Sequence, residues 1–117
     1  MDPNNPDTYF IRGNAKTKLG DYKSAVLDFS KTINLSAGYE DAYYSRANAK
    51  FQLKDYKGAI EDYTLSIELN GKDAKSYLKR GLTSITLNNK KEGCKDLIKA
   101  GELGYFDAYA LINQYCK

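Results

Sequence analysis

Residues 9–16 read YFIRGNAK, residues 43–50 read YYSRANAK and residues 77–84 read YLKRGLTS, so closely similar text recurs every thirty-four residues. The register extends beyond these stretches. Residues 6–39 and 40–73 are identical at 14 of 34 positions without a gap. A fixed period of this length is typical of a stacked array of structural repeats.

Each unit of this repeat predicts two antiparallel helices joined by a tight turn. In the first unit, apolar and small residues fall at helical spacing before and after Gly20 and Asp21. Gly20 permits the left-handed backbone that ends one helix, and the Asp21 carboxylate can accept hydrogen bonds from the first amides of the next. We therefore expect a second helix over roughly 22–35, and a similar hairpin in the two later units.

The whole chain, 1–117, is expected to be a single all-α domain of stacked helical hairpins. Its three units span about 6–39, 40–73 and 74–107. The last segment, about 105–116, has a helical apolar stripe but does not restart the repeated text. We expect it to be a helix that caps the open end of the stack.

Composition excludes several classes of function. The 117 residues carry a formal net charge of +3, which is too mild to predict a polyanion as partner, and no apolar run is long enough to cross a bilayer. There is no histidine, the commonest general base and metal ligand, and we expect neither a cofactor nor a metal. Cys94 and Cys116 are too few for a disulfide framework, so free thiols in a reducing cytoplasm are the expectation.

No arrangement of residues predicts an enzyme. The sequence has no Gly-rich phosphate loop, no Cys-x-x-Cys motif and no visible pair of nucleophile and base. The nearest approach to a pair of catalytic carboxylates is Glu61 and Asp62, but consecutive residues of a helix point in different directions. We interpret them as one solvated acid beside one structural acid.

The repeated residues resemble the tetratricopeptide repeat family. The resemblance rests on the 34-residue period, on an aromatic residue four positions before a small one, and on the text LGDY at residues 19–22 with Ala25 and Leu35 after it. It covers residues 6–107, and 105–116 resembles the family's final helix. It implies a right-handed α-solenoid whose first helices line a concave groove. That groove binds an extended peptide or a helix of a partner protein, in a scaffold or adaptor role.

The resemblance also implies which side chains line the groove. They come from the first helix of each unit, and the full set is Asp7, Phe10, Ile11, Asn14, Thr17, Lys18, Asp41, Tyr44, Ser45, Asn48, Phe51, Gln52, Lys75, Leu78, Lys79, Leu82, Ile85 and Thr86. The residues expected to form the binding site are Phe10, Asn14, Lys18, Tyr44, Asn48, Phe51, Lys75, Lys79 and Leu82. Asn14 and Asn48 are the strongest candidates, because an amide can both donate to and accept from a peptide backbone.

Family members that bind the acidic C-termini of heat-shock chaperones hold the terminal carboxylates with Lys, Asn, Asn, Lys and Arg. The matching positions here are Phe10, Asn14, Ser45, Lys75 and Lys79. The first cation is missing, and a lysine in place of the arginine loses the bidentate fork. The resemblance therefore predicts no intact clamp, and only a preference for an acidic segment near the two lysines.

Two other functions of a repeat array stay open. The unusually aromatic ends could stack end to end into a homo-oligomer, a structural role that is compatible with peptide binding. Nucleic-acid binding by a related helical repeat is less consistent with the sequence, because basic residues are interspersed with acidic ones. The predicted partner is thus a protein or peptide, with neither nucleic acid nor membrane.

One column of the repeat departs from the family. It holds an arginine where the family usually has an apolar residue, and each arginine lies sixteen residues before an aspartate. The pairs are Arg12 with Asp28, Arg46 with Asp62 and Arg80 with Asp96. In an antiparallel hairpin the two positions fall at nearly the same height on facing helices. We expect an ion pair in each unit with a structural role, the arginine stem packed against the aromatics.

Overall fold

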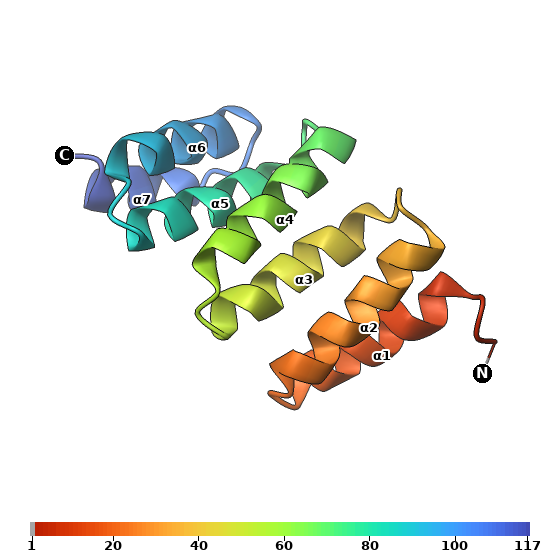
Figure 1. Ribbon diagram of the computed structural model, residues 1–117. Helices are drawn as coiled ribbons and strands as arrows, with labels where there is room; N and C mark the ends of the chain where they lie inside the picture. The colour runs from red at the N-terminus through yellow and green to blue at the C-terminus, as the bar shows by residue number, and fades with distance from the viewer. Residues whose placement is uncertain (1) are drawn as a thin grey trace.

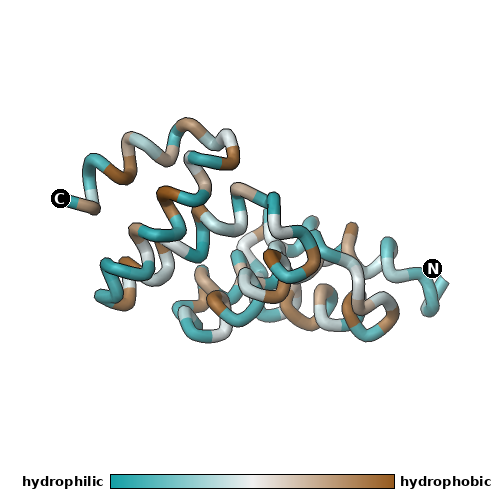
Figure 2. Tube along the Cα trace, turned by 90° about the horizontal axis from the view of Figure 1, so that it is seen from above, coloured by the Kyte–Doolittle hydropathy of each residue, from teal (hydrophilic) through white to brown (hydrophobic). Residues whose placement is uncertain are grey.

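The computed structural model describes residues 2–117, and its seven helices form an elongated row of antiparallel pairs (Figure 1). The helices are α1 (Pro6–Lys18), α2 (Tyr22–Leu35), α3 (Glu40–Gln52), α4 (Tyr56–Leu69), α5 (Ala74–Thr86), α6 (Lys90–Glu102) and α7 (Ala108–Tyr115). The first six make three hairpins, each packed on the next, and α7 lies against α6. The predicted all-α array of three hairpins with a capping helix is confirmed. The molecule measures 50 × 25 × 20 Å, and its two termini lie at opposite ends (Figure 2).

The three hairpin turns share one backbone conformation. Gly20, Lys54 and Asn88 all have positive φ angles, of 80°, 65° and 65°. This left-handed conformation ends the first helix of each hairpin. In the first two turns the next residue, Asp21 or Asp55, accepts a hydrogen bond on its side chain from the backbone amide three residues on. The second helix therefore starts where the capping aspartate predicts.

Each hairpin packs one small residue under one large one. A Cβ atom added at Gly13 would lie 2.6 Å from the ring of Phe29. Ala47 packs against Tyr63 in the second hairpin. A Cβ at Gly81 would lie 2.8 Å from a backbone carbonyl oxygen of α6. The two helices of each hairpin approach so closely that a larger residue in this column would push them apart.

A bidentate arginine–aspartate pair joins the two helices of every hairpin. The distances to the two carboxylate oxygens are 2.9 and 2.7 Å for Arg12 with Asp28, 2.8 and 2.8 Å for Arg46 with Asp62, and 2.8 and 2.9 Å for Arg80 with Asp96. Lys16 and Lys50 add a contact of 3.0 Å to the aspartates of the first two hairpins. Each guanidinium also lies 5.5 to 5.8 Å from the ring of the tyrosine three residues before it.

Two of these arginines also tie their hairpin to the preceding one. Arg46 Nη1 donates to the Ser30 hydroxyl at 3.0 Å, and Arg80 Nη1 donates to the Thr64 hydroxyl at 3.2 Å. The side chain of Arg46 is 17% exposed and that of Arg80 23%, whereas Arg12, at the start of the array, is 46% exposed. Arg46 and Arg80 therefore join the two helices of their own hairpin and also join that hairpin to the preceding one.

The α7 helix covers the apolar end of the third hairpin. Its residue Ala108 is fully buried, and Leu111 and Ile112 pack against the same cluster. That cluster includes Leu78 from α5 and Leu97 from α6. The segment at 105–107 is a turn, so the helix is shorter than the expected 105–116.

Cys94 and Cys116 form a disulfide bond, so the expectation of two free thiols is wrong. Cys94 lies on α6, and Cys116 directly follows α7, 22 residues later. The two meet only because α7 folds back over α6, a proximity that the spacing of two cysteines does not predict. The bond fastens the capping helix to the third hairpin.

Two carboxylates meet where the second and third hairpins begin. Glu40 is the first residue of α3, and Asp73 directly precedes α5. Burial and the neighbouring Asp73 carboxylate raise the pKa of Glu40 to about 6. The Asp73 carboxylate also accepts a hydrogen bond of 2.9 Å from the Ser76 hydroxyl. We therefore expect the stability of this junction between two hairpins to depend on pH.

Asp62→Ala should destabilise the chain by about 3–5 kcal/mol, because Arg46 and Lys50 then lose their carboxylate in a largely buried site. Arg46→Ala should cost less, because Lys50 still contacts Asp62. In a double-mutant cycle measured by urea denaturation, the coupling free energy should be about 2 kcal/mol or more. The pair of Arg12 and Asp28 is the internal comparison. Its coupling should be smaller, since solvent reaches that arginine. A coupling near zero for Arg46 and Asp62 would contradict the structural role.

Deleting residues 105–117 should expose Leu97 and Leu103, lower the melting temperature and promote association. The double substitution Cys94→Ser and Cys116→Ser should be milder. It should lower the free energy of unfolding by about 3 kcal/mol, because the unfolded chain is no longer closed into a loop. Calorimetry and light scattering measure both effects. A truncated chain that stays monomeric with an unchanged melting temperature would show that this segment is not a cap.

The substitution Glu40→Gln should stabilise the chain above about pH 6 and leave it unchanged below about pH 4.5. The sign follows from the raised pKa. The folded state holds the proton more tightly than the unfolded state, so the stability that protonated Glu40 contributes is lost as the pH rises through 6. Thermal melts from pH 4 to 8 measure the difference, with Glu68→Gln on the exposed side of α4 as the control. A difference that does not change with pH would refute the carboxylate pair.

Candidate functional site

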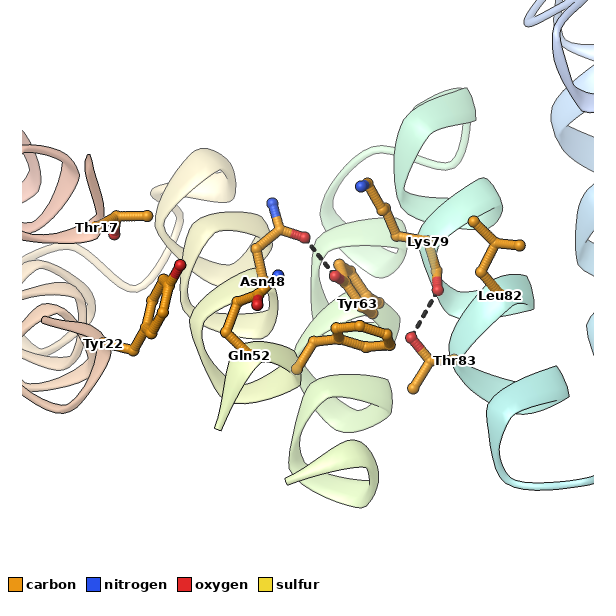
Figure 3. A pocket seen from close by; sticks show the side chains of 9 residues that line it. Thr17, Tyr22, Asn48, Gln52, Tyr63, Lys79, Leu82 and Thr83 are labelled. Carbon is orange, nitrogen blue, oxygen red and sulfur yellow. Dashed lines mark hydrogen bonds between the residues drawn. The ribbon is translucent and has the colours of Figure 1, made fainter. Parts of the chain in front are cut away.

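One side of the array is formed by the first helix of each hairpin, and a cavity opens on it. This cavity has a volume of about 340 Å³ and is lined by α1, α3 and α5, with one tyrosine each from α2 and α4 (Figure 3). The lining residues are Thr17, Tyr22, Asn48, Phe51, Gln52, Tyr63, Lys79, Leu82 and Thr83. The cavity therefore draws on all three hairpins, and we call this surface the groove face.

Part of the predicted binding site lies in this cavity. The predicted residues that line it are Asn48, Phe51, Lys79 and Leu82. The predicted residues outside its lining, on the same three helices, are Phe10, Asn14, Lys18, Tyr44 and Lys75. Leu78, from the wider predicted set, is only 6% exposed and belongs to the core beneath α7.

Tyr63 holds Asn48 from the second helix of the same hairpin. The Tyr63 side chain is almost fully buried, and its hydroxyl donates a hydrogen bond to the Asn48 side-chain oxygen. Burial raises the pKa of Tyr63, so the hydroxyl keeps its proton at neutral pH. With its oxygen engaged, Asn48 retains the amide NH₂ group as a donor for a ligand.

The equivalent positions in the other two hairpins are less polar. In the first hairpin Phe29 stands where Tyr63 stands in the second, so no hydroxyl lies beneath Asn14. Phe10 packs against this phenylalanine, with the ring centroids 5.8 Å apart. In the third hairpin Leu82 occupies the position that Asn14 and Asn48 hold in the first two, so this position has no amide. The cavity consequently has amides at its centre, and its apolar wall is formed by Phe51 of α3 and Leu82 of α5.

Two lysines of α5 supply positive charge to the groove face. The Lys75 ammonium lies 5.0 Å from the centroid of the Tyr44 ring, a cation–π contact. Burial raises the pKa of Tyr44, and the nearby Asn48 amide and Lys75 ammonium oppose that rise. Lys79 is exposed, and Figure 3 shows its side chain above the apolar wall on the same rim as Asn48. An anionic group of a ligand would meet Lys79 at this rim.

Sequence reasoning overlooks three residues that line the cavity: Tyr22 and Tyr63, which come from second helices, and Thr83 of α5. The Tyr63 ring packs against Ala47 in the core of the second hairpin, while its hydroxyl reaches the cavity. Tyr22 follows the capping Asp21 directly. An antiparallel hairpin places the start of its second helix beside the end of the first, which is the signal that could have indicated Tyr22.

The side chains that line the cavity are suited to binding a ligand. Its lining provides amide and hydroxyl groups, aromatic faces, a leucine and one ammonium group. Within the part of the chain that the structure describes, no group of three or more His, Cys, Asp or Glu residues is arranged to hold a metal ion. No helix among residues 2–117 is both long enough and apolar enough to span a membrane.

The sequence profiles of the tetratricopeptide repeat match residues 6–39 and residues 40–73. These segments are the first two hairpins and make up more than half of the chain. The chain belongs to the tetratricopeptide repeat family, whose fold is a non-catalytic helical repeat. The third hairpin lies outside both matches, in keeping with Gly93 and Gly101, which replace an alanine and an isoleucine of the second repeat. A search of curated protein sequences gives no match.

Solved structures with this fold include domains with bound peptides. The first tetratricopeptide repeat domain of Spaghetti (RPAP3), bound to the HSP90 peptide SRMEEVD, is 26% identical over 99% of this chain and 94% of its own, with a TM-score of 0.91. The second such domain of human RPAP3, in complex with the HSP70 peptide SGPTIEEVD, is 25% identical over 96% and 98%, with a TM-score of 0.86. MamA is 25% identical over 92% of this chain, with a TM-score of 0.88, and the chain spans only 64% of its length.

Proposed function

We propose that this chain is a protein–protein interaction module that binds a peptide or a helix of a partner protein on the groove face, as a scaffold or adaptor. The observation that carries the proposal is the cavity between α1, α3 and α5, which joins an apolar wall to a rim of hydrogen-bonding groups. Peptide sites need both features. Main-chain hydrogen bonds hold the backbone of the ligand, and apolar pockets select its side chains.

Each part of the cavity has a role in this proposal. The Asn48 amide donates to a carbonyl of the ligand backbone, and Asn14 extends the same column toward α1. Phe51 and Leu82 receive an apolar side chain of the ligand. Lys79 pairs with a carboxylate beside that side chain, at an exposed position where such a pair adds specificity more than affinity.

The similar RPAP3 domains support a peptide as the ligand, and both of their bound peptides end in Glu-Glu-Val-Asp. In this chain Phe10 occupies the position of the first cation of the chaperone clamp, and its ring is packed against Phe29. Ser45 occupies the position of the second amide. We therefore propose a ligand with an acidic residue near Lys79, held without a complete clamp on its C-terminal carboxylate.

Asn14→Ala and Asn48→Ala should each weaken binding of a peptide selected on the wild-type domain by phage display. The loss of one hydrogen bond to the ligand backbone should cost about 1–3 kcal/mol, or roughly ten- to a hundredfold in Kd. Fluorescence anisotropy measures the Kd, and circular dichroism checks that the helices are intact. Asn34→Ala, an exposed asparagine on α2, is the matched control and should bind as the wild type does.

Two results would count against this function. One is a selection that yields no peptide. The other is a peptide that both variants bind as tightly as the wild-type domain, which would place the binding site elsewhere.

A further inference from the structure

A second cavity lies between α4, α5 and α6, and it shares no lining residue with the cavity on the groove face. Its volume is about 330 Å³, and α5 lies between the other two helices (Figure 1). We call it the α6 cavity. Its lining includes Ile60 of α4, Arg80 and Ser84 of α5, Asn89 directly before α6, and Glu92 and Asp96 of α6.

The first two hairpins show which group accompanies the aspartate of the arginine pair. The Lys16 ammonium lies 3.0 Å from the Asp28 carboxylate, and the Lys50 ammonium lies 3.0 Å from the Asp62 carboxylate. Each of these aspartates is therefore neutralised by two cations, one guanidinium and one ammonium.

The third hairpin lacks the ammonium. Ser84 stands at the position of the two lysines, thirty-four residues after the second of them. Among residues 2–117, Asp96 receives only the two hydrogen bonds from Arg80, of 2.8 and 2.9 Å. Both Ser84 and Asp96 line the α6 cavity. The cavity therefore lies beside the aspartate, at the position from which a lysine side chain extends in the other hairpins.

Two polar side chains of this cavity have no partner within the described chain. Ser84 is only 6% exposed, and its hydroxyl makes no hydrogen bond to another residue between 2 and 117. Asn89 occupies the N-cap of α6, but its side chain accepts no hydrogen bond from the helix, unlike Asp21 and Asp55 at the equivalent positions. A buried hydroxyl without a partner costs free energy, which a ligand that bonds to it recovers.

The α6 cavity carries a negative formal charge. Its charged residues are Arg80, Glu92 and Asp96, and Glu92 stands where the second hairpin has Gly58. Lys95 contacts Glu92 at 3.3 Å, but both of these side chains are more than half exposed, so this pair contributes little and opens easily. The third hairpin thus has an additional carboxylate close to the place where it lacks an ammonium.

An ammonium group fits this chemistry better than a metal ion does. Ammonium has three N–H donors, and the cavity offers oxygen acceptors on Asp96, Ser84 and Asn89. A divalent metal ion would be repelled more strongly by Arg80, and it prefers six or more oxygen ligands. Ile60 adds an apolar side chain, against which the methylene groups of an alkyl chain can pack.

We propose that the α6 cavity binds a primary alkylammonium group, which either a small amine or a lysine side chain supplies. The ammonium pairs with Asp96 and Glu92 and donates to the Ser84 hydroxyl, while its alkyl chain lies along Ile60. The ligand thereby makes the contact in the third hairpin that a lysine makes in each of the first two. This site is separate from the groove face and does not depend on peptide binding there.

The first test is a titration of the isotope-labelled chain with n-butylammonium, followed by nuclear magnetic resonance. It is carried out in about 150 mM NaCl, which screens exposed charges. The ligand should shift the signals of the Ser84 amide, the Asn89 side chain and the Arg80 Nε–H, with a Kd of about 1 mM for so small a molecule. n-Butyltrimethylammonium has the same charge but no N–H donor, and it should bind about tenfold more weakly.

A blocked lysine, Nα-acetyl-lysine methylamide, distinguishes the two sources of the ammonium. Binding as tight as that of n-butylammonium would assign the site to a lysine side chain of a protein. Binding about tenfold weaker, because the backbone of the blocked lysine does not fit beside α5 and α6, would assign it to a small amine.

Variants of the chain locate the site. Ser84→Lys restores the lysine of the other hairpins, so it should abolish the shifts and give a higher melting temperature than Ser84→Met, which has a similar length without the charge. Glu92→Gln should weaken binding of n-butylammonium about tenfold. Glu102→Gln removes the same charge from another exposed position of α6 and should leave binding unchanged.

Four results would overturn the proposal. One is the absence of shifts at about 10 mM n-butylammonium, and another is equal binding of the trimethyl compound. The third is binding that persists in Ser84→Lys. The fourth is a Ser84→Met variant that melts at the same temperature as Ser84→Lys or higher, since an ammonium beside Asp96 would then have no favourable place.

Discussion

A guanidinium group held between two helices recurs at the same place in every hairpin, and the stack depends on it. The carboxylate of Asp62 is 2% exposed, so its charge is tolerable only while Arg46 and Lys50 face it. Two nearly parallel hydrogen bonds fix the height at which α3 and α4 meet. The remaining nitrogen of the same arginine reaches back to Ser30, so one side chain sets both the hairpin and its position on the preceding hairpin.

The groove face is a consequence of this arrangement. Small residues let the two helices of each hairpin approach closely, and the arginine pairs keep α1, α3 and α5 in one register. Side chains about thirty-four residues apart, such as Thr17, Phe51 and Leu82, can then line the same cavity. Tyr63 contributes to both the hairpin core and the groove face, because its ring packs in the core while its hydroxyl orients the Asn48 amide.

The third hairpin departs from the repeat because its neighbour is different. Each of the first two hairpins is followed by another hairpin, whereas the third is followed by the short α7. Gly101 leaves room for the Tyr109 ring, and Gly93 allows α6 to approach α5, where a Cβ would lie 2.6 Å from the Gly81 carbonyl oxygen. The bond between Cys94 and Cys116 then fastens a helix of eight residues that would have little stability alone.

Features that are set by residues close in the sequence, or by a spacing that recurs in every repeat, could be predicted from the sequence. The thirty-four-residue period indicated the hairpins, Asp21 and Gly20 indicated where helices begin and end, and the sixteen-residue spacing from Arg46 to Asp62 indicated their pairing. Three of the nine residues that line the cavity, and several contacts elsewhere, were beyond this reasoning. The place of Tyr63 in the site, the hydroxyl that reaches Arg46 and the disulfide at the cap each depend on the distance and angle between helices, which arise only when all the helices have packed together.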